Sequence, residues 1–178
     1  MREDSVARYR AGGPPRRIRS AGVVNVRAAE WETNENGAAA CMFESGAVSF
    51  PEIGYRLAVL QPRTTVGFYH AESNQEDFLV LGGECVLLIE GEERRLKPWD
   101  FVHCPPGTEH VFVGAGDGPC VIFMTGARSA EKSIVYPRSE LALRHGVGVE
   151  EETTSPNEAY ATFPKWQPGR KGPWPIPD

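Results

Sequence analysis

Short apolar runs separated by turn residues are the feature that most constrains the fold of this chain. Between Ala40 and Gly126 such runs alternate with turns such as Gly82-Gly83 and Pro105–Gly107. The chain holds 19 glycines and 15 prolines, and no stretch of this region keeps a helical period. Several short strands bounded by such turns are typical of a sandwich or barrel. The sequence therefore predicts an all-β fold.

The apolar runs give the expected strands. A first strand is expected at Val23–Val26. The region after it predicts strands at 41–43, 55–60, 66–72, 77–81, 85–90, 94–96, 101–104, 110–113 and 120–124.

The composition of the chain changes along its length and predicts three segments. Residues 1–37 contain few large apolar groups near their start, so we expect a partly disordered N-terminal arm. Residues 38–128 hold the strand pattern and are expected to form the β-barrel. Residues 129–178 are expected to add short helices and an extended end that pack on the barrel.

Two helix signals lie in the C-terminal segment. Ser139 is a suitable N-cap for a short helix over Glu140–His145, which Gly146 stops. Ser155 begins a capping box with Pro156 at the first helical position. Two short helices are therefore expected to cover one outer face of the barrel.

Charge, hydropathy and cysteine use exclude several classes of protein. The net charge of −5 gives no reason to expect a nucleic-acid partner. No apolar run approaches the roughly 20 residues of a membrane span, and Met1–Asp4 lack a signal-peptide core. The cysteines lie far apart, so we expect small buried hydrophobes rather than a zinc knuckle. These observations predict a cytoplasmic protein without a membrane or nucleic-acid partner.

Four side chains in two short segments suit a metal ion. His70, Glu72 and Glu76 lie close together, and His110 follows the Pro105–Gly107 turn. Strand alternation places His70 and Glu72 on one face. The turns bring Glu76 and His110 towards the same point. Because imidazole and carboxylate bind first-row metals, we expect one divalent transition-metal ion, Zn, Fe, Mn or Ni.

With these spacings the chain resembles a small single-domain cupin with a conserved barrel. His70, Glu72, Glu76 and Gly83 match the offsets of the first cupin motif, and Asp100, Pro105, Gly107 and His110 match the second. The resemblance covers about residues 40–126. It implies a cupin-type double-stranded β-helix barrel, or jelly-roll. It also implies a metal inside the barrel, which cupins hold with three histidines and a glutamate.

The chain departs from the cupin pattern at four positions. Glu72 stands where the second histidine is expected. Thr64, Trp99 and Gly114 replace two motif glycines and an asparagine. Trp99 and Gly114 concern turn geometry, whereas Glu72 concerns the metal ligands themselves.

Two interpretations of Glu72 are open. In the first, His70, Glu72, Glu76 and His110 all bind the ion, and the added oxygen ligand favours harder metals. In the second, Glu72 is a catalytic base beside the metal. The remaining two histidines and one carboxylate are then the facial triad of non-haem iron enzymes.

Other polar side chains are interpreted as structural. His103 is expected to be packed or exposed, and His145 is expected at the C-terminal end of a helix. Cys104 lacks a basic neighbour other than His103, so it is expected to be inert.

The expected barrel lining suits a small organic ligand with an apolar part and a carbonyl, enolate or carboxylate. The residues expected to face the interior are Phe68, Phe78, Val80, Phe101 and Phe112.

Two functions from different classes follow from this pattern. One is a metal-dependent cupin enzyme with oxygenase, isomerase or lyase chemistry. The other is a non-catalytic barrel that binds or senses a small molecule, with a structural metal or none. Residues alone do not decide between them. The long N-terminal arm and the open strand edges predict a homodimer.

Overall fold

The structure is a computed structural model that describes residues 23–44 and 50–169. The order of the large sheet is β12 (Trp166–Pro168), β1 (Glu30–Asn34), β2 (Ala39–Met42), β3 (Ile53–Leu60), β10 (Cys120–Ala127), β5 (Glu76–Gly82) and β8 (Phe101–Cys104). A second sheet has the order β7 (Glu92–Leu96), β6 (Glu84–Ile89) and β9 (His110–Ala115). A short pair joins β4 (Ala71–Glu72) to β11 (Ile134–Val135).

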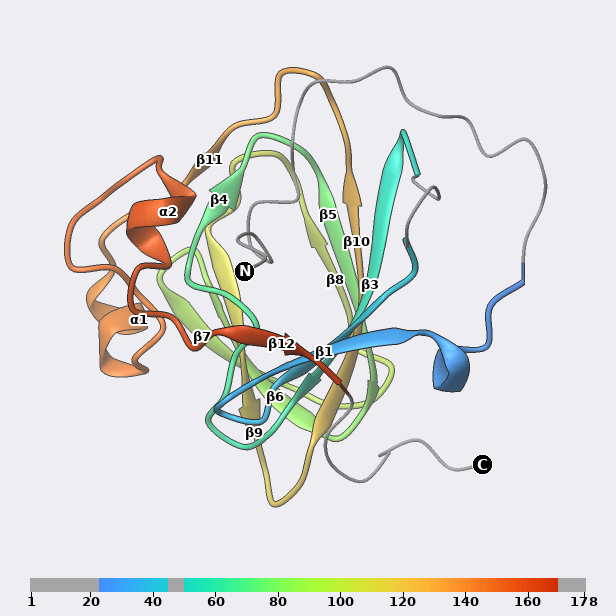
Figure 1. Cartoon of the computed structure of the whole chain (residues 1–178). Coiled ribbons are helices and arrows are strands. Elements are labelled where there is room, and N and C mark those ends of the chain that lie inside the picture. The colour runs from blue at the N-terminus through green and yellow to red at the C-terminus, as the bar shows by residue number, and fades with distance from the viewer. Residues whose placement is uncertain (1–22, 45–49, 170–178) are drawn as a thin grey trace.

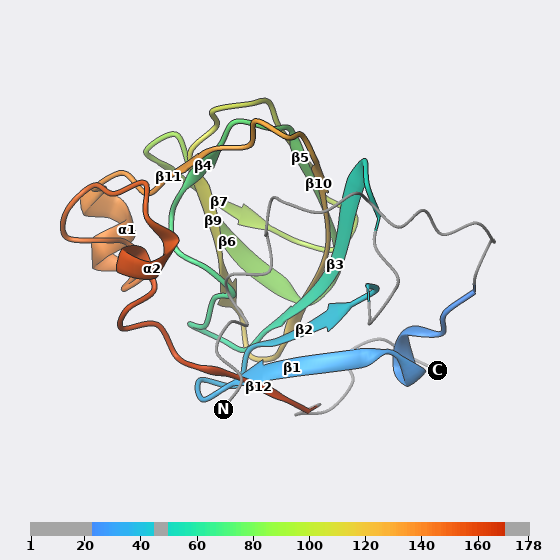
Figure 2. The same cartoon turned by 45° about the horizontal axis from the view of Figure 1, so that its top comes forward.

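All paired strands are antiparallel, and the sheets curve around a common interior (Figures 1 and 2). The predicted all-β jelly-roll barrel is confirmed. No described helix is long and apolar enough to cross a membrane.

Two of the predicted strands are wrong in part. Val23–Val26 was expected as a strand, but a 3-10 helix, η1 (Val26–Ala28), begins there instead. The cause is local, because the Asn25 side chain accepts a hydrogen bond from the Arg27 amide at 2.9 Å. Of the expected strand at 66–72, only Ala71–Glu72 forms a strand, β4. Thr65 bends the chain before it, since its hydroxyl donates to the Gly67 carbonyl at 2.7 Å.

The ends of the described chain meet on the large sheet. Strand β1 pairs with β2 on one side and with β12 on the other. Strands β1 and β12 both lie outside residues 38–128, the range that the sequence assigned to the barrel. The predicted division of the chain into three segments stays a prediction. Predictions for residues 1–22 and 170–178 concern residues outside the described part.

The barrel interior is filled by apolar side chains from both larger sheets. Phe78, Val80 and Phe112 lie in this cluster, as expected. Phe101 was expected there too, and this is wrong: it is 64% exposed. Strand β8 alternates in the opposite phase, so that Val102 and Cys104 face inward. Phe68 packs elsewhere, against Tyr160 and Phe163.

The two predicted helices form where their caps place them. Helix α1 (Glu140–Arg144) begins after Ser139, whose hydroxyl accepts from the Ala142 amide at 3.3 Å. Helix α2 (Pro156–Ala159) begins after Ser155. Residues from both helices share a cluster with β6 and β9, and Figure 1 shows them together on one side of the barrel.

All four cysteines, Cys41, Cys85, Cys104 and Cys120, are buried and free of disulfides, in agreement with their expected role as small hydrophobes. Burial raises the pKa of Cys104 to about 12. The thiol is therefore protonated at neutral pH, which agrees with an inert residue.

A row of apolar residues crosses six strands of the large sheet on its outer face. Each residue is the direct partner of the next, in the order Trp31, Cys41, Leu57, Phe123, Leu79 and Phe101. We call these residues the apolar row. The first three are buried and the last is exposed, so the cover over this face ends partway across the sheet.

Gly114 is required by a close approach of two chain segments. A Cβ atom added there would lie 2.1 Å from the carbonyl oxygen of Gln61. Replacement of Gly114 by alanine should therefore lower the free energy of unfolding by about 2 kcal/mol, a typical cost of overpacking. Urea denaturation measures this change.

Gly118 is the matched control for Gly114, because a Cβ added there meets nothing within 4 Å. Gly118→Ala should change the free energy of unfolding by less than about 0.5 kcal/mol. Equal effects of the two substitutions would contradict the steric explanation.

Candidate metal centre

Three of the four predicted ligands come together at one end of the barrel. His70, Glu76 and His110 each offer one ligand atom, and these atoms lie within 4.8 Å of one another. His70 lies just before β4, Glu76 begins β5, and His110 begins β9. We call these three residues the His/Glu/His group.

Backbone hydrogen bonds hold the two histidine segments together. The His110 amide donates to the His70 carbonyl at 2.8 Å, and the His70 amide donates to the His110 carbonyl at 3.2 Å. The Gly107 amide also donates to the Glu72 carbonyl at 2.7 Å, from a turn in which Gly107 has a φ of +85°. This conformation favours glycine. The turn that precedes His110 is thus hydrogen-bonded to the segment that contains His70 and Glu72.

Backbone carbonyls also fix the tautomers of both imidazoles. The Nδ1 of His70 lies 2.6 Å from the Phe68 carbonyl, and the Nδ1 of His110 lies 3.0 Å from the Thr108 carbonyl. Because a carbonyl can only accept, Nδ1 carries the proton in each ring. The Nε2 atoms of the neutral rings are then free acceptors. Metal-binding histidines are commonly oriented in this way.

The charges in the group favour a cation. Glu76 Oε2 lies 3.9 Å from His70 Nε2 and 3.6 Å from His110 Nε2, which is too long for hydrogen bonds. Burial, and then the nearby Glu72 carboxylate, raise the pKa of Glu76 to about 8. Burial lowers the pKa of His110 to about 4 and also lowers the pKa of His70. Once Glu76 loses its proton, three acceptors therefore face one another with no donor among them, and this ligand set fits a divalent transition metal.

Glu72 lies beside the group but is not one of its three members. Its carboxylate is 8% exposed, and Lys132 Nζ lies 2.6 Å from its Oε2. The arrangement resembles the second interpretation of Glu72, in which the group holds two histidines and one carboxylate. Whether Glu72 also contacts the ion stays a prediction.

Sequence reasoning missed two residues near the group. Lys132 lies in the loop before β11, and Tyr136 follows that strand. The ring of Tyr136 lies 6.0 Å from the His70 ring, and burial raises the pKa of Tyr136. Neither residue belongs to a motif. Only the pairing of β11 with β4 brings them here, and a strand of two residues gives no pattern that a sequence could reveal.

Aromatic rings form the wall behind the group. The ring of Phe78 lies 5.1 Å from the His110 ring and 4.7 Å from the ring of Phe112. These contacts place an apolar surface directly beside a candidate ligand. Tyr136 packs on the side of His70, edge-on to Tyr160.

The other two histidines lie away from the group and have their own partners. His103 is exposed on β8 and its Nδ1 lies 2.6 Å from the Asp77 carboxylate. His145 caps α1, and its Nε2 lies 3.0 Å from the Glu93 carboxylate. Their structural interpretation agrees with these contacts.

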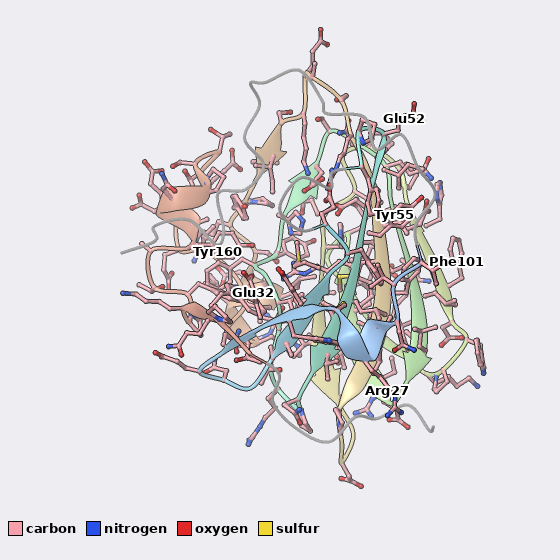
Figure 3. All side chains as sticks on the ribbon, turned by 45° about the vertical axis from the view of Figure 1, so that its right-hand side comes forward. Arg27, Glu32, Glu52, Tyr55, Phe101 and Tyr160 are labelled. Atoms are coloured by element: carbon pink, nitrogen blue, oxygen red, sulfur yellow. The ribbon has the colours of Figure 1, made fainter. Side chains whose placement is uncertain are left out.

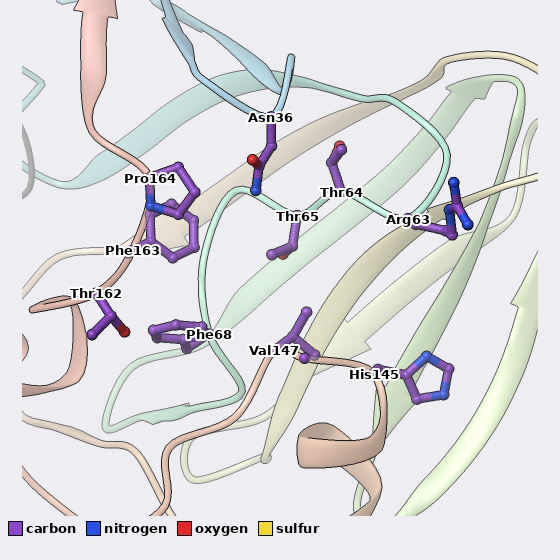
Figure 4. A pocket seen from close by; sticks show the side chains of 11 residues that line it. Asn36, Arg63, Thr64, Thr65, Phe68, His145, Val147, Thr162, Phe163 and Pro164 are labelled. Atoms are coloured by element: carbon purple, nitrogen blue, oxygen red, sulfur yellow. The ribbon is translucent and has the colours of Figure 1, made fainter.

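A cavity of about 290 Å³ lies outside the barrel interior. It is lined by Asn36, by residues of the loop 63–68 and by the segments 145–147 and 162–164, with Phe68 and Phe163 as its aromatic wall (Figure 4). None of its lining residues belongs to the His/Glu/His group. It is therefore separate from the candidate metal centre.

Comparison with known proteins supports the cupin resemblance. Residues 56–126 match the family model described as Cupin domain. A solved sugar phosphate isomerase from a cupin superfamily, from Silicibacter pomeroyi, is 19% identical, with a TM-score of 0.58 over 68% of this chain and 89% of that chain. The polyketide cyclase RemF from Streptomyces resistomycificus is 14% identical, with a TM-score of 0.53 over 61% of this chain and 80% of that chain.

A third solved structure, from Acidithiobacillus ferrooxidans, is 27% identical with a TM-score of 0.48 over 51% of this chain, and the match spans only 60% of that protein. No match was found among curated proteins. The barrel topology, the motif spacing and the family match agree with one another. Residues 56–126 of this chain therefore form a cupin domain.

Proposed function

We propose that His70, Glu76 and His110 bind one divalent transition-metal ion, and that the protein uses this ion to act on a small organic molecule. The observation that carries the proposal is the convergence of two Nε2 atoms and the Glu76 carboxyl, which are three acceptors once that carboxyl has lost its proton. Burying such a set is costly unless a cation or a proton joins it.

A bound ion would supply Lewis-acid chemistry, by polarising a carbonyl, enolate or carboxylate oxygen of the substrate. Two histidines and one carboxylate leave coordination positions open, which is the usual composition of a catalytic rather than a closed structural site. Zinc, iron, manganese and nickel all accept this donor set.

Glu72 is the proposed proton-transferring residue. It lies close enough to Glu76 for its negative charge to raise the pKa of that carboxyl. The ammonium of Lys132, at 2.6 Å, holds the Glu72 carboxylate in place and compensates its charge. Lys132 is thus proposed as a positioning residue, which keeps a second carboxylate beside the site without making the site more negative.

The walls of the site indicate the class of substrate. Phe78 and Phe112 offer an apolar surface next to His110, which suits the hydrocarbon part of a small molecule. An oxygen of the same molecule would face the His/Glu/His group. Oxygenase, isomerase and lyase reactions all begin from such an arrangement.

Metal content tests the site directly. His70→Ala and His110→Ala should each reduce the bound metal from about one ion per chain to a trace, because each substitution removes one of three ligands. Mass spectrometry of the metals in the purified protein measures this. The exposed His103 provides the control, and His103→Ala should leave the content unchanged. Equal metal content in wild type and both ligand variants would rule out the site.

The stability of the metal-free protein should fall as the pH rises from about 6.5 to 8. The folded protein holds a proton on Glu76 up to about pH 8, whereas the unfolded chain releases it near pH 4.3. A proton bound only in the folded state stabilises it less as the pH rises, by about 2 kcal/mol over this window. The lowered pKa values of His70 and His110 act only below about pH 6.5.

Urea denaturation with a chelator at the two pH values measures this loss. Glu76→Gln should abolish it, because the amide does not titrate. An added divalent ion should also reverse it in the wild type, since the ion replaces the proton. The same loss in Glu76→Gln as in the wild type would show that another group is responsible.

The two interpretations of Glu72 are separated by Glu72→Gln. If Glu72 is a base and not a ligand, the variant should keep its metal and lose turnover by about 100-fold or more, whereas Glu76→Gln should lose the metal. Turnover is measured with a panel of small carbonyl and phenolic compounds, by oxygen uptake and product analysis. Loss of metal in Glu72→Gln would make Glu72 a fourth ligand. Metal without any turnover in the wild type would favour the non-catalytic binding barrel.

A further inference from the structure

The cavity between the loop 63–68 and the C-terminal segment has a lining that the proposed function does not use. Its volume is about 290 Å³, at the lower end of the range for small-molecule sites. Because a water molecule occupies about 30 Å³ in the liquid, a ligand of about ten non-hydrogen atoms fits this volume. Most of its lining residues lie outside residues 56–126, the range that matches the cupin family. Segments on both sides of the matched range are therefore needed to build the cavity.

Two departures from the cupin pattern shape the loop on one side of the cavity. Thr64 replaces a motif glycine and lines the cavity, and Gly114 replaces the motif asparagine. The Gly114 amide donates to the Thr64 carbonyl at 2.9 Å, and the Arg63 amide donates to the Gly114 carbonyl at 2.8 Å. Arg63 has a φ of +66°, which is unfavourable for a residue other than glycine. The two departures thus meet in one backbone contact that holds Arg63 and Thr64 at the cavity.

Aromatic rings form the apolar wall of the cavity. The rings of Phe68 and Phe163 lie 5.1 Å apart and edge-on to each other, and Val147 also lines the cavity. Tyr160 stacks on Phe68, with the ring centroids 5.4 Å apart. Figure 3 shows Tyr160 on the side of the helices, opposite the exposed Phe101. This wall suits the flat apolar part of a small molecule.

The polar side of the cavity carries positive charge and hydrogen-bond donors. The described residues that line the cavity include Arg63 and His145, and none of them is acidic, although the chain has 24 acidic residues. Within the described part of the chain, the side chains of Asn36, Arg63 and Thr162 have no hydrogen-bond or ion-pair partner. In Figure 4 the Asn36 amide points towards the centre of the cavity, and Phe163 and Arg63 lie on opposite sides of it. This lining is complementary to an anion with an apolar part.

We propose that this cavity is a second binding site, separate from the metal centre, for a small organic acid. The flat apolar part of the ligand packs on Phe68 and Phe163, and its carboxylate meets the guanidinium of Arg63. Arg63 is exposed, so its side chain can turn towards the ligand. An arginine and a carboxylate form two parallel charge-assisted hydrogen bonds, and the Asn36 amide supplies a further donor.

The proposed site lies against the two segments that hold His70 in place. The Phe68 carbonyl lies 2.6 Å from the Nδ1 of His70, and the Val147 carbonyl accepts from the Tyr69 amide at 2.8 Å. A ligand that packs on Phe68 and Val147 therefore restrains the segment that presents His70 to a metal. This part of the inference rests on the proposed metal centre. Bound ligand should tighten metal binding, and by thermodynamic linkage the metal should tighten ligand binding by the same factor.

Benzoate is the probe for the site, because it has the expected size, a flat apolar ring and a carboxylate. It is titrated into the full chain with a chelator present, and the amide signals are followed by NMR. Binding should saturate with a dissociation constant of about 1 mM or lower. The signals of Thr65, Gly146 and Val147 should shift, and those of Phe78 and Phe112 in the barrel interior should not. Absence of saturable binding, or shifts confined to the barrel interior, would overturn the proposal.

Arg63→Gln tests the role of the charge, since it removes the guanidinium and keeps a polar side chain. It should weaken benzoate binding by about fivefold or more. Benzyl alcohol, which lacks the carboxylate, should bind the wild type more weakly by a similar factor. Arg94→Gln is the matched control, because Arg94 is exposed on β7 of the other sheet, and it should leave the affinity unchanged. Equal affinities of the wild type and Arg63→Gln would also overturn the proposal.

The zinc affinity, measured by competition with a chelator, tests the link to His70. Saturating benzoate should raise it by about fivefold in the wild type, at the lower end of typical coupling between sites, but not in Arg63→Gln. An unchanged zinc affinity, or an equal rise in both proteins, would overturn the link. If the wild type binds no zinc, the proposed function fails, whereas benzoate binding to the metal-free chain still decides whether the second site exists.

Discussion

The candidate centre depends on the backbone bridge between His70 and His110. These residues are far apart in the sequence, and their reciprocal hydrogen bonds, at 2.8 and 3.2 Å, set the separation of the two rings. The same segments supply the carbonyls of Phe68 and Thr108 that fix both tautomers. Strands β5 and β9 then begin at Glu76 and His110, so the barrel itself converges the three side chains. The positions and the tautomers of the two imidazoles therefore come from one set of main-chain contacts.

Electrostatics divides the carboxylates of the site into two environments. Glu76 faces two neutral rings and lacks a hydrogen-bond donor from them, so burial makes its charge costly. Glu72 faces the ammonium of Lys132. The Glu76 carboxyl can thus exchange its proton for a cation, whereas the Glu72 carboxylate lies beside a cationic side chain. Two carboxylates in different environments commonly take different roles in a single site.

The sequence predicted what depends on local pattern and missed what depends on long-range pairing. Spacing and turn chemistry located His70, Glu76 and His110, because each lies at a strand start set by neighbouring residues. Lys132 could not be found, since the short pairing of β11 with β4 places it. The phase of β8 was also mistaken, and Phe101 faces outward. Trp99, which has a positive φ, lies two residues before Phe101 in the turn that leads into β8.

The pairing of β1 with β12 has a consequence for the order in which the molecule forms. The strands from β3 to β10 are contiguous in sequence and can assemble as soon as they leave the ribosome. Strand β1 is made earlier, but its outer edge stays open until Trp166–Pro168 has been synthesised. During that interval the nascent chain exposes an unpaired strand to its neighbours. The last described strand therefore closes an edge that stays open during most of the synthesis of the polypeptide.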